Sequence, residues 1–200
     1  MILACLSIMM TAGLATVNAQ TPVSFGVKQE TNFSNFLLSG LGRESSKMRP
    51  GPSLGGFVNF GLSQSFSIQP EVMLFYRQSL SKAGPVSDTF RQWGMQVPVY
   101  FMGQTPTSCG KFYAGVGPYL GVGFNAKYKH ADHNLYKKYH SKAAMNRWDF
   151  GFGVMVGHEF FNSMQINAGY QVGVVDQLDA FKKSASKRTQ TLSVGLGYRF

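Results

Sequence analysis

The stretch FYAGVGPYLGVGFNA, residues 112–126, alternates strictly between two kinds of side chain. Its even positions are apolar throughout, whereas its odd positions hold only glycine, tyrosine and asparagine. Successive side chains of a β-strand point to opposite faces, so a period of two separates the two kinds completely. The stretch therefore predicts a β-strand with one apolar face and one small or polar face.

Comparable alternation recurs along the chain and ends with LSVGLGYRF, residues 192–200. We count eight such segments of about 9 to 15 residues, and a tilted strand needs about 9 to 11 residues to cross a bilayer. Connections between them are expected at 35–50, 63–65, 78–89, 103–110, 127–146, 161–163 and 176–188. Long and short connections alternate, which is typical of outer-membrane barrels with short periplasmic turns and longer outer loops.

The composition agrees with many short strands. Hydrophobic residues make up 44% of the 200 residues and charged residues only 14%, whereas an ordinary soluble domain is about 25% charged. Beyond the first 20 residues, no apolar run approaches the roughly 18 residues of a membrane helix. The sequence thus predicts an all-β fold, an eight-stranded antiparallel transmembrane β-barrel with the up-and-down meander of OmpA and OmpX.

The beginning of the chain has the features of a secretory signal. The segment 2–17 is mostly small and apolar, and Val17 and Ala19 are small residues at the −3 and −1 positions before Gln20. We therefore expect a signal peptide at 1–19 and a β-barrel domain at 20–200. Removal of the signal leaves Cys109 as the one cysteine, which excludes an intramolecular disulfide. We interpret Cys109 as an inert thiol in a turn.

The direction of the apolar face separates two classes of barrel. A soluble lipocalin-like barrel points its apolar residues inward, but here the opposite face is glycine, asparagine, glutamine and charge. Eight strands leave an interior just wide enough for side chains, and buried charges there need partners. The predicted lumenal network consists of Lys28, Glu30, Glu71, Arg77, Asp149, Glu159 and Arg199, with Gln69, Gln96, Gln165, Asn167 and Gln171.

Three prolines, Pro70, Pro98 and Pro118, lie inside predicted strands, where each removes a hydrogen-bond donor and where local bulges are expected. The segments that carry the pattern are FGVKQETNFSN (25–35), FSIQPEVMLFY (66–76), MQVPVYF (95–101), FYAGVGPYLGVGF (112–124), RWDFGFGVMVGHEF (147–160) and the closing LSVGLGYRF. In this order they resemble the PorT-like small outer-membrane β-barrels abundant in Bacteroidetes. The resemblance implies that the three prolines are family features and that the protein resides in the cell outer membrane.

Positive charge is concentrated in the predicted outer loops. Of the 19 lysine and arginine residues, 16 lie in or beside the four long connections, with five of the nine acidic residues. The most basic outer loop contains Lys127, Lys129, Lys137, Lys138 and Lys142, interleaved with Tyr128, Tyr136 and Tyr139. Two interpretations stay open, namely contact with the phosphates of lipopolysaccharide and the outer-membrane lipid, or a receptor surface for an acidic extracellular ligand. Nucleic acid is not expected as a partner.

Candidate chemical sites are few. His130, Asp132, His133 and His140 have the residue types of metal ligands, but the neighbouring lysines repel a cation, so we interpret them as a solvated loop. His158 is interpreted as an interfacial side chain near a strand end. No motif places a nucleophile beside its base. We therefore predict a protein that is not an enzyme and has no metal or cofactor.

A structural or binding role in the cell envelope is the function that these features favour. The alternative is transport, either as a narrow porin-like pore or as a component of a protein secretion system. The final strand is expected to pair with the first, because an open edge is not tolerated in lipid. Its aromatic end, Tyr198 and Phe200, resembles the signal that the barrel assembly machinery recognises.

Overall fold

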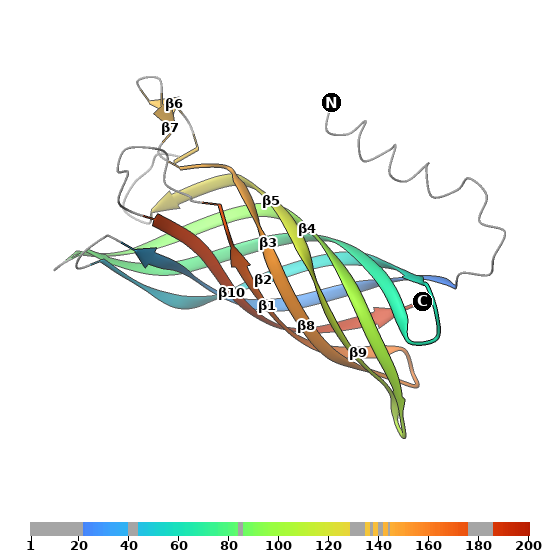
Figure 1. Cartoon of the computed structure of the whole chain (residues 1–200). Helices are drawn as coiled ribbons and strands as arrows, with labels where there is room; N and C mark the ends of the chain where they lie inside the picture. Colours follow the sequence, from blue (N-terminus) through green and yellow to red (C-terminus); the bar gives the residue numbers. More distant parts are fainter. Residues whose placement is uncertain are drawn as a thin grey trace.

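The computed structural model describes residues 22–39, 44–83, 86–128, 135–136, 138–139, 142–143, 145–175 and 186–200. Eight antiparallel strands form the wall of a closed barrel (Figure 1). They are β1 Val23–Ser39, β2 Glu44–Gly61, β3 Phe66–Ala83, β4 Val86–Thr107, β5 Gly110–Tyr128, β8 Trp148–Phe160, β9 Met164–Gly173 and β10 Ser186–Arg199. Two further strands of two residues each, β6 Lys138–Tyr139 and β7 Lys142–Ala143, pair with each other outside the wall.

The barrel closes between the first and last strands. The strand order is β1-β10-β9-β8-β5-β4-β3-β2, so every wall strand pairs with its neighbours along the chain. The β1–β10 register runs from Gly26 opposite Arg199 to Ser39 opposite Ser186. The predicted eight-stranded antiparallel barrel and the pairing of its two ends are confirmed, and the ladder leaves no free edge.

Apolar side chains cover the outer face of the wall. In β10, Leu192, Val194 and Leu196 are exposed, whereas Thr191 and Ser193 between them are buried. The same alternation holds in β8, where Phe152, Val154 and Val156 face outward. Polar groups therefore occupy many interior positions and apolar groups line the exterior, which is the arrangement opposite to that of a lipocalin-like barrel. Within the described residues, no helix is long and apolar enough to span a membrane.

Two predicted connections are too long. The segments 35–50 and 78–89 were expected to be loops, but β1, β2, β3 and β4 extend into them and leave only 40–43 and 84–85 between strands. The reason is that a ladder needs only backbone hydrogen bonds, so a hairpin continues after its apolar pattern has ended. Long connections remain between β5 and β8 and between β9 and β10.

Pro70, Pro98 and Pro118 do not lie at bulges. Pairing of β3 with β4 lapses after Pro70 and resumes at Met73 in the same register, and pairing of β4 with β5 does the same between Pro98 and Phe101. The expected bulges are thus wrong for these prolines, because the ladder omits bonds without inserting a residue. The two register shifts lie between Arg49 and Ser53 and between Trp93 and Gly94.

The second shift corrects the predicted face of Ala126. Trp93 pairs with Asn125 while Gly94 pairs with Gly123, so Phe124 is an extra residue in β5. An extra residue reverses the alternation beyond it. Ala126 was predicted on the apolar outer face, but it lies inside the barrel and is 0% exposed.

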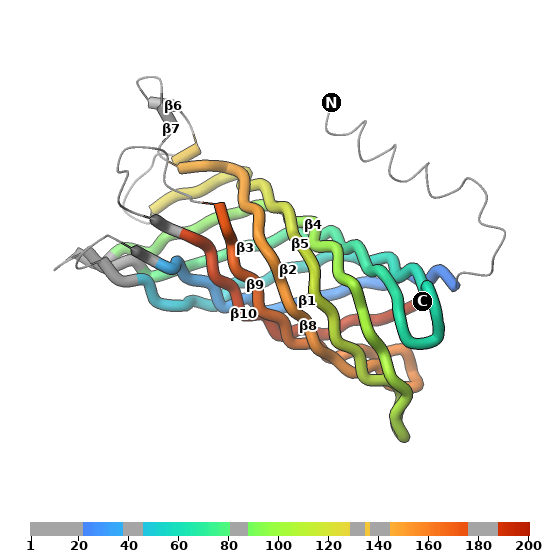
Figure 2. The backbone as a smooth tube through the Cα atoms, in the orientation of Figure 1, coloured from blue at the N-terminus to red at the C-terminus, as the bar shows by residue number. Residues whose placement is uncertain are grey.

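The barrel has two different ends. The short-turn end contains the turns 62–65, 108–109 and 161–163, the start of β1 and the end of β10, and the loop end lies opposite. The turn between β4 and β5 projects beyond the neighbouring strands at the short-turn end (Figure 2). Its position places Cys109 at an exposed tip.

Candidate functional site

The interior of the barrel is held by three groups of ion pairs, which we call the charged core. The central group surrounds the Lys28 ammonium, which is almost fully buried. Its Nζ lies 3.0 Å from both carboxylate oxygens of Glu71, 3.1 Å from Oε1 of Glu30 and 3.1 Å from Sδ of Met155. Gln69 donates from Nε2 to Glu71 at 2.9 Å. The Lys28 ammonium therefore partly neutralises two carboxylates, one in β1 and one in β3.

A second group lies around the Arg77 guanidinium. Its NH1 donates to Oδ2 of Asp149 at 3.3 Å, its NH2 donates to Oε1 of Gln96, and the group stacks 4.0 Å from the Phe75 ring centroid. The hydroxyl of Tyr119 donates to the other oxygen of Asp149 at 3.3 Å. Both oxygens of this buried carboxylate thus have a partner, as burial of a charge requires.

The third group lies toward the short-turn end around Glu159. Its carboxylate contacts Nζ of Lys111 at 3.0 Å and Nε of Arg199 at 2.9 Å, and Gln165 donates to it at 2.6 Å. Lys111 was not in the predicted network. Its odd position, which it shares with Tyr113 and Tyr119, could have identified it as inward-facing.

Inclusion of Lys111 balances the charged core. The three groups contain four cations and four carboxylates, namely Lys28, Arg77, Lys111 and Arg199 with Glu30, Glu71, Asp149 and Glu159. The five amides predicted to accompany them are also buried: Gln69, Gln96, Gln165, Asn167 and Gln171. The structure thus brings all seven predicted lumenal charges to the interior and supplies the pairing that the sequence left open.

Large uncharged side chains fill the space between these groups. Tyr100, Met102, Tyr113 and Met155 pack as one buried cluster in the middle of the barrel. The Tyr100 hydroxyl accepts a hydrogen bond from Gln171 at 3.1 Å. The interior is therefore not only polar, as the alternation suggested, because these inward positions combine apolar bodies with few polar atoms.

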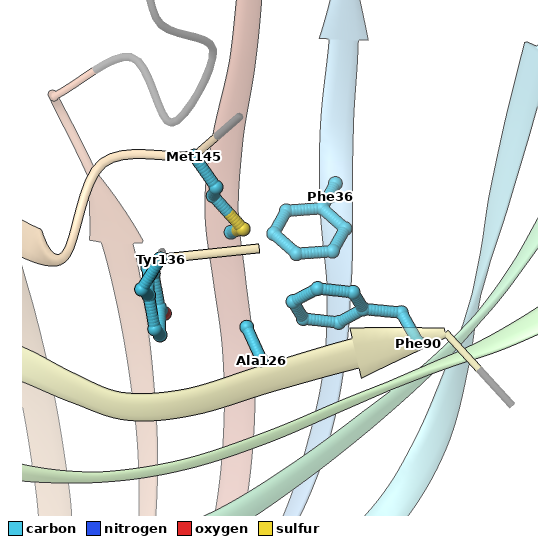
Figure 3. Packing of buried hydrophobic residues seen from close by; sticks show 5 residues of the cluster. All are labelled: Phe36, Phe90, Ala126, Tyr136 and Met145. Carbon is cyan, nitrogen blue, oxygen red and sulfur yellow. The ribbon is translucent and has the colours of Figure 1, made fainter. Parts of the chain in front are cut away.

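The loop end of the interior is covered by a second buried cluster, which we call the cap. It consists of Phe36, Phe90, Ala126, Tyr136 and Met145. Figure 3 shows the rings of Phe36 and Phe90 next to each other, with Tyr136 and Met145 closing the space beside them. The ring centroids of Phe36 and Phe90 are 5.1 Å apart. Two of these side chains, Tyr136 and Met145, come from the connection between β5 and β8.

Tyr136 is fixed in the cap from several sides. Its hydroxyl accepts from Nε2 of Gln92 at 2.6 Å, and its carbonyl accepts from the Arg147 guanidinium at 3.3 Å. Gly123 leaves room for the ring, since a Cβ there would overlap the Tyr136 hydroxyl and ring. Burial raises the pKa of Tyr136 to about 12. The sequence placed Tyr136 among outer-loop lysines, but it is 2% exposed, because an apolar ring is more stable on the cap than in water.

The predicted basic outer loop is only partly within the described residues. Lys127 is half-buried and is the register partner of Arg91 in the β4–β5 ladder. Lys138 lies in β6 and Lys142 lies in β7. Lys129 and Lys137 lie outside the described residues, as do His130, Asp132, His133 and His140. No cluster of three metal-ligating side chains occurs in the part of the chain that the structure describes.

The aromatic end of the chain lies on the outer face. Tyr198 and Phe200 are both exposed, with ring centroids 5.3 Å apart. The backbone N–H of Phe200 donates to the carbonyl of Phe25 at 2.8 Å, and their rings are 5.6 Å apart. The last residue is thus part of the closed wall and is not a frayed end.

The turn thiol has a neighbour that the sequence did not reveal. Sγ of Cys109 lies 3.5 Å from Nε2 of His158, and the Thr107 hydroxyl lies 2.9 Å from the same nitrogen. No motif in the sequence indicates this pair, because the β5–β8 pairing joins two segments that are far apart along the chain. Nδ1 of His158 has no hydrogen-bond partner among the described residues, so no carboxylate orients it as a catalytic triad would.

Comparisons with known proteins agree with this architecture. A family model described as outer membrane protein beta-barrel domain matches residues 1–200. Among solved structures, neisserial surface protein A is similar with a TM-score of 0.52 and 15% identity, covering 89% of this chain and 99% of that one. OprG from Pseudomonas aeruginosa has a TM-score of 0.52 and 12% identity, covering 88% and 96%. Comparison with curated proteins gives no match.

Proposed function

Because the chain belongs to the outer membrane protein beta-barrel domain family and resides in the cell outer membrane, we propose that it serves as a closed barrel that binds partners at the cell surface. One observation carries this proposal: the interior is filled by a charge-balanced core and covered by the cap. Eight-stranded walls are narrow, so the side chains that fill this interior are expected to block a continuous water path. The role is structural and binding, with no catalysis.

The orientation follows from the two ends of the barrel. Short turns face the periplasm in outer-membrane barrels and longer loops face outward. The loop end is then extracellular, and removal of residues 1–19 as a signal peptide accompanies export. Within the family we propose that the chain belongs to the PorT-like group, which the order of the segments 25–35, 66–76, 95–101, 112–124, 147–160 and 192–200 supports.

A planar-bilayer recording tests the closed interior. Purified, folded wild-type protein should give no steady conductance, because the cap and the charged core occlude the barrel. Steady single-channel steps from the folded protein would contradict the proposal and support the alternative of a narrow pore. The sample's fold is checked beforehand by its heat-modifiable migration in gels, so that silence does not result from unfolded protein.

The other alternative, a part in protein secretion, predicts a different phenotype. A deletion strain should then keep secreted cargo in the periplasm, whereas a surface-binding role leaves secretion normal. We expect normal secretion. Retained cargo that is restored by the wild-type gene would overturn the binding role in favour of secretion.

The basic outer loop is the proposed contact for lipopolysaccharide or another acidic extracellular ligand. Its charge attracts an anionic partner mainly at low ionic strength. Neutralisation of Lys137, Lys138 and Lys142 to glutamine should weaken binding to lipopolysaccharide more at low salt than at high salt. Equal affinity of wild type and variant at low salt would show that these lysines only solubilise the loop.

A further inference from the structure

Two cations and a glutamine lie in one cross-strand row on the outer face near the loop end. Gln78 of β3 is the register partner of Arg91 in β4, which is the partner of Lys127 in β5. Arg91 is exposed, while Gln78 and Lys127 are half-buried. Neighbouring strands are about 4.8 Å apart, so the row is roughly 10 Å long.

The row lies directly beyond an aromatic pair. Tyr76 and Trp93 are register partners two residues closer to the middle of the barrel, with ring centroids 4.7 Å apart. Two strand residues correspond to about 7 Å. Amphipathic aromatic rings mark the headgroup level of a bilayer, so the cations lie at or just outside that level.

The row is not neutralised by the protein. Arg91 and Lys127 are directly opposed like charges, which is unfavourable without a counter-ion. In β2 to β5 the acidic residues are Glu44, Glu71 and Asp88. Glu71 is in the charged core, and Asp88 shares its strand face with the inward Phe90. No ion pair joins Arg91 or Lys127 to a carboxylate within the described ranges.

We propose that the row Gln78–Arg91–Lys127, next to Tyr76 and Trp93 on the loop side, binds the phosphorylated headgroup of an outer-leaflet glycolipid. This inference deepens the surface-binding role proposed above. A guanidinium group pairs with phosphate oxygens through two hydrogen bonds. The amide nitrogen of Gln78 beside Arg91 donates one hydrogen bond to the Pro50 carbonyl at 3.4 Å and has a second N–H for the phosphate. The acyl chains of the same lipid lie against the apolar outer face below, where Leu74 and Trp93 are exposed.

A lipid fits this position better than a soluble anion. The cations are on the outer side of the wall, next to the apolar face, and not at the mouth of the lumen. A soluble anion would gain the charge contacts alone, whereas a lipid gains them together with the aromatic and acyl contacts. We therefore expect the row to bind a phosphate group that belongs to a membrane lipid.

The test compares lipids that differ only in phosphate. Folded protein is placed in zwitterionic nanodiscs that contain either diphosphorylated lipid A or the same lipid without phosphates, and retained lipid is measured by native mass spectrometry. The variant is Arg91→Gln with Lys127→Gln. The matched control is Arg188→Gln, an exposed cation of β10 outside β2–β5.

Wild type and Arg188→Gln should retain phosphorylated lipid A preferentially. Each cation near an anionic headgroup contributes about fivefold in affinity, so the double variant should lose roughly thirtyfold. Its preference should also depend less on salt than that of wild type. Equal retention of the two lipids by wild type, or an unchanged preference in the double variant, would overturn the proposal. If the protein gives no conductance and shows no lipid preference, the lipid site is wrong but the proposed closed barrel still holds.

Discussion

The two parts of the filled interior are built in opposite ways. The charged core uses only side chains of the wall strands, such as Lys28 of β1, Glu71 of β3 and Asp149 of β8. The cap combines wall residues with Tyr136 and Met145 from the β5–β8 connection. Closure of the barrel is therefore sufficient to form the core, whereas the cap also needs a segment of chain to fold back onto it.

Because of this difference, the charged core should determine the stability of the barrel, and the cap should determine whether the interior is blocked. Loss of one partner in the core leaves an uncompensated charge inside the wall, and the whole barrel bears the cost. Loss of a cap residue removes apolar contacts at one end, and the strands below keep their ladder. We therefore expect core variants to affect folding, and cap variants to affect passage through the barrel.

The largest expected effect is that of Lys28→Met. Without its ammonium, Glu30 and Glu71 face each other with no cation between them, which costs about 3–5 kcal/mol in a buried site. The midpoint of urea unfolding in detergent should fall accordingly. The double variant Lys28→Met with Glu71→Gln should recover much of the loss, since it removes both charges of the pair that Lys28 and Glu71 form at 3.0 Å. A single variant as stable as wild type would contradict the pairing.

Tyr136→Ala should have a smaller effect on stability and a larger effect on permeation. Loss of a buried aromatic ring costs about 3 kcal/mol, but here the cost falls on the connection and not on the ladder. We expect the strands to remain folded and a conductance to develop in planar bilayers. Tyr170→Ala, an outward-facing tyrosine of β9 outside the cap, is the control and should stay silent. A silent Tyr136→Ala barrel would show that the charged core alone occludes the interior.

The wall and the charged core could largely be predicted from the sequence, and the cap could not. Alternation with a period of two assigns Lys28, Glu71 and Asp149 to the interior, because each lies opposite an apolar face in its own strand. Their partners were not readable, since pairing depends on the stagger between strands. The cap was missed because Tyr136 lies in a connection, where no period exists to show that it turns inward.

The position of Ala126 illustrates a second limit. The extra residue Phe124 reverses the faces of β5, and a single chain gives no sign of it, because both sides of the bulge keep the alternation. The bulge turns Ala126 toward Phe90 and Tyr136. An irregularity that pattern analysis cannot detect therefore supplies part of the cap.

The variant Gly123→Ala tests the contact between Gly123 and the Tyr136 ring. The added methyl group would overlap that ring, and overpacking of this kind costs about 2 kcal/mol. The cost should fall close to zero in a Tyr136→Ala background, since the ring is then absent. Gly121→Ala on the same strand is the matched control, because its nearest neighbour, Cβ of Asp149, is 3.4 Å away. If Gly123→Ala lowers the stability equally with and without the Tyr136 ring, the two residues are not in contact.

The smallest expected effect is the titration of the cap. Burial raises the pKa of Tyr136 to about 12, above the usual value of about 10, so the neutral phenol is the form that the cap stabilises. Its contribution is complete below pH 10 and is lost as the pH rises to about 12. The absorbance difference at about 295 nm between wild type and Tyr136→Phe reports this one ionisation among the tyrosines. A difference midpoint near pH 10 would place the ring in water and remove it from the cap, whereas a midpoint near 12 would confirm that the connection folds inward.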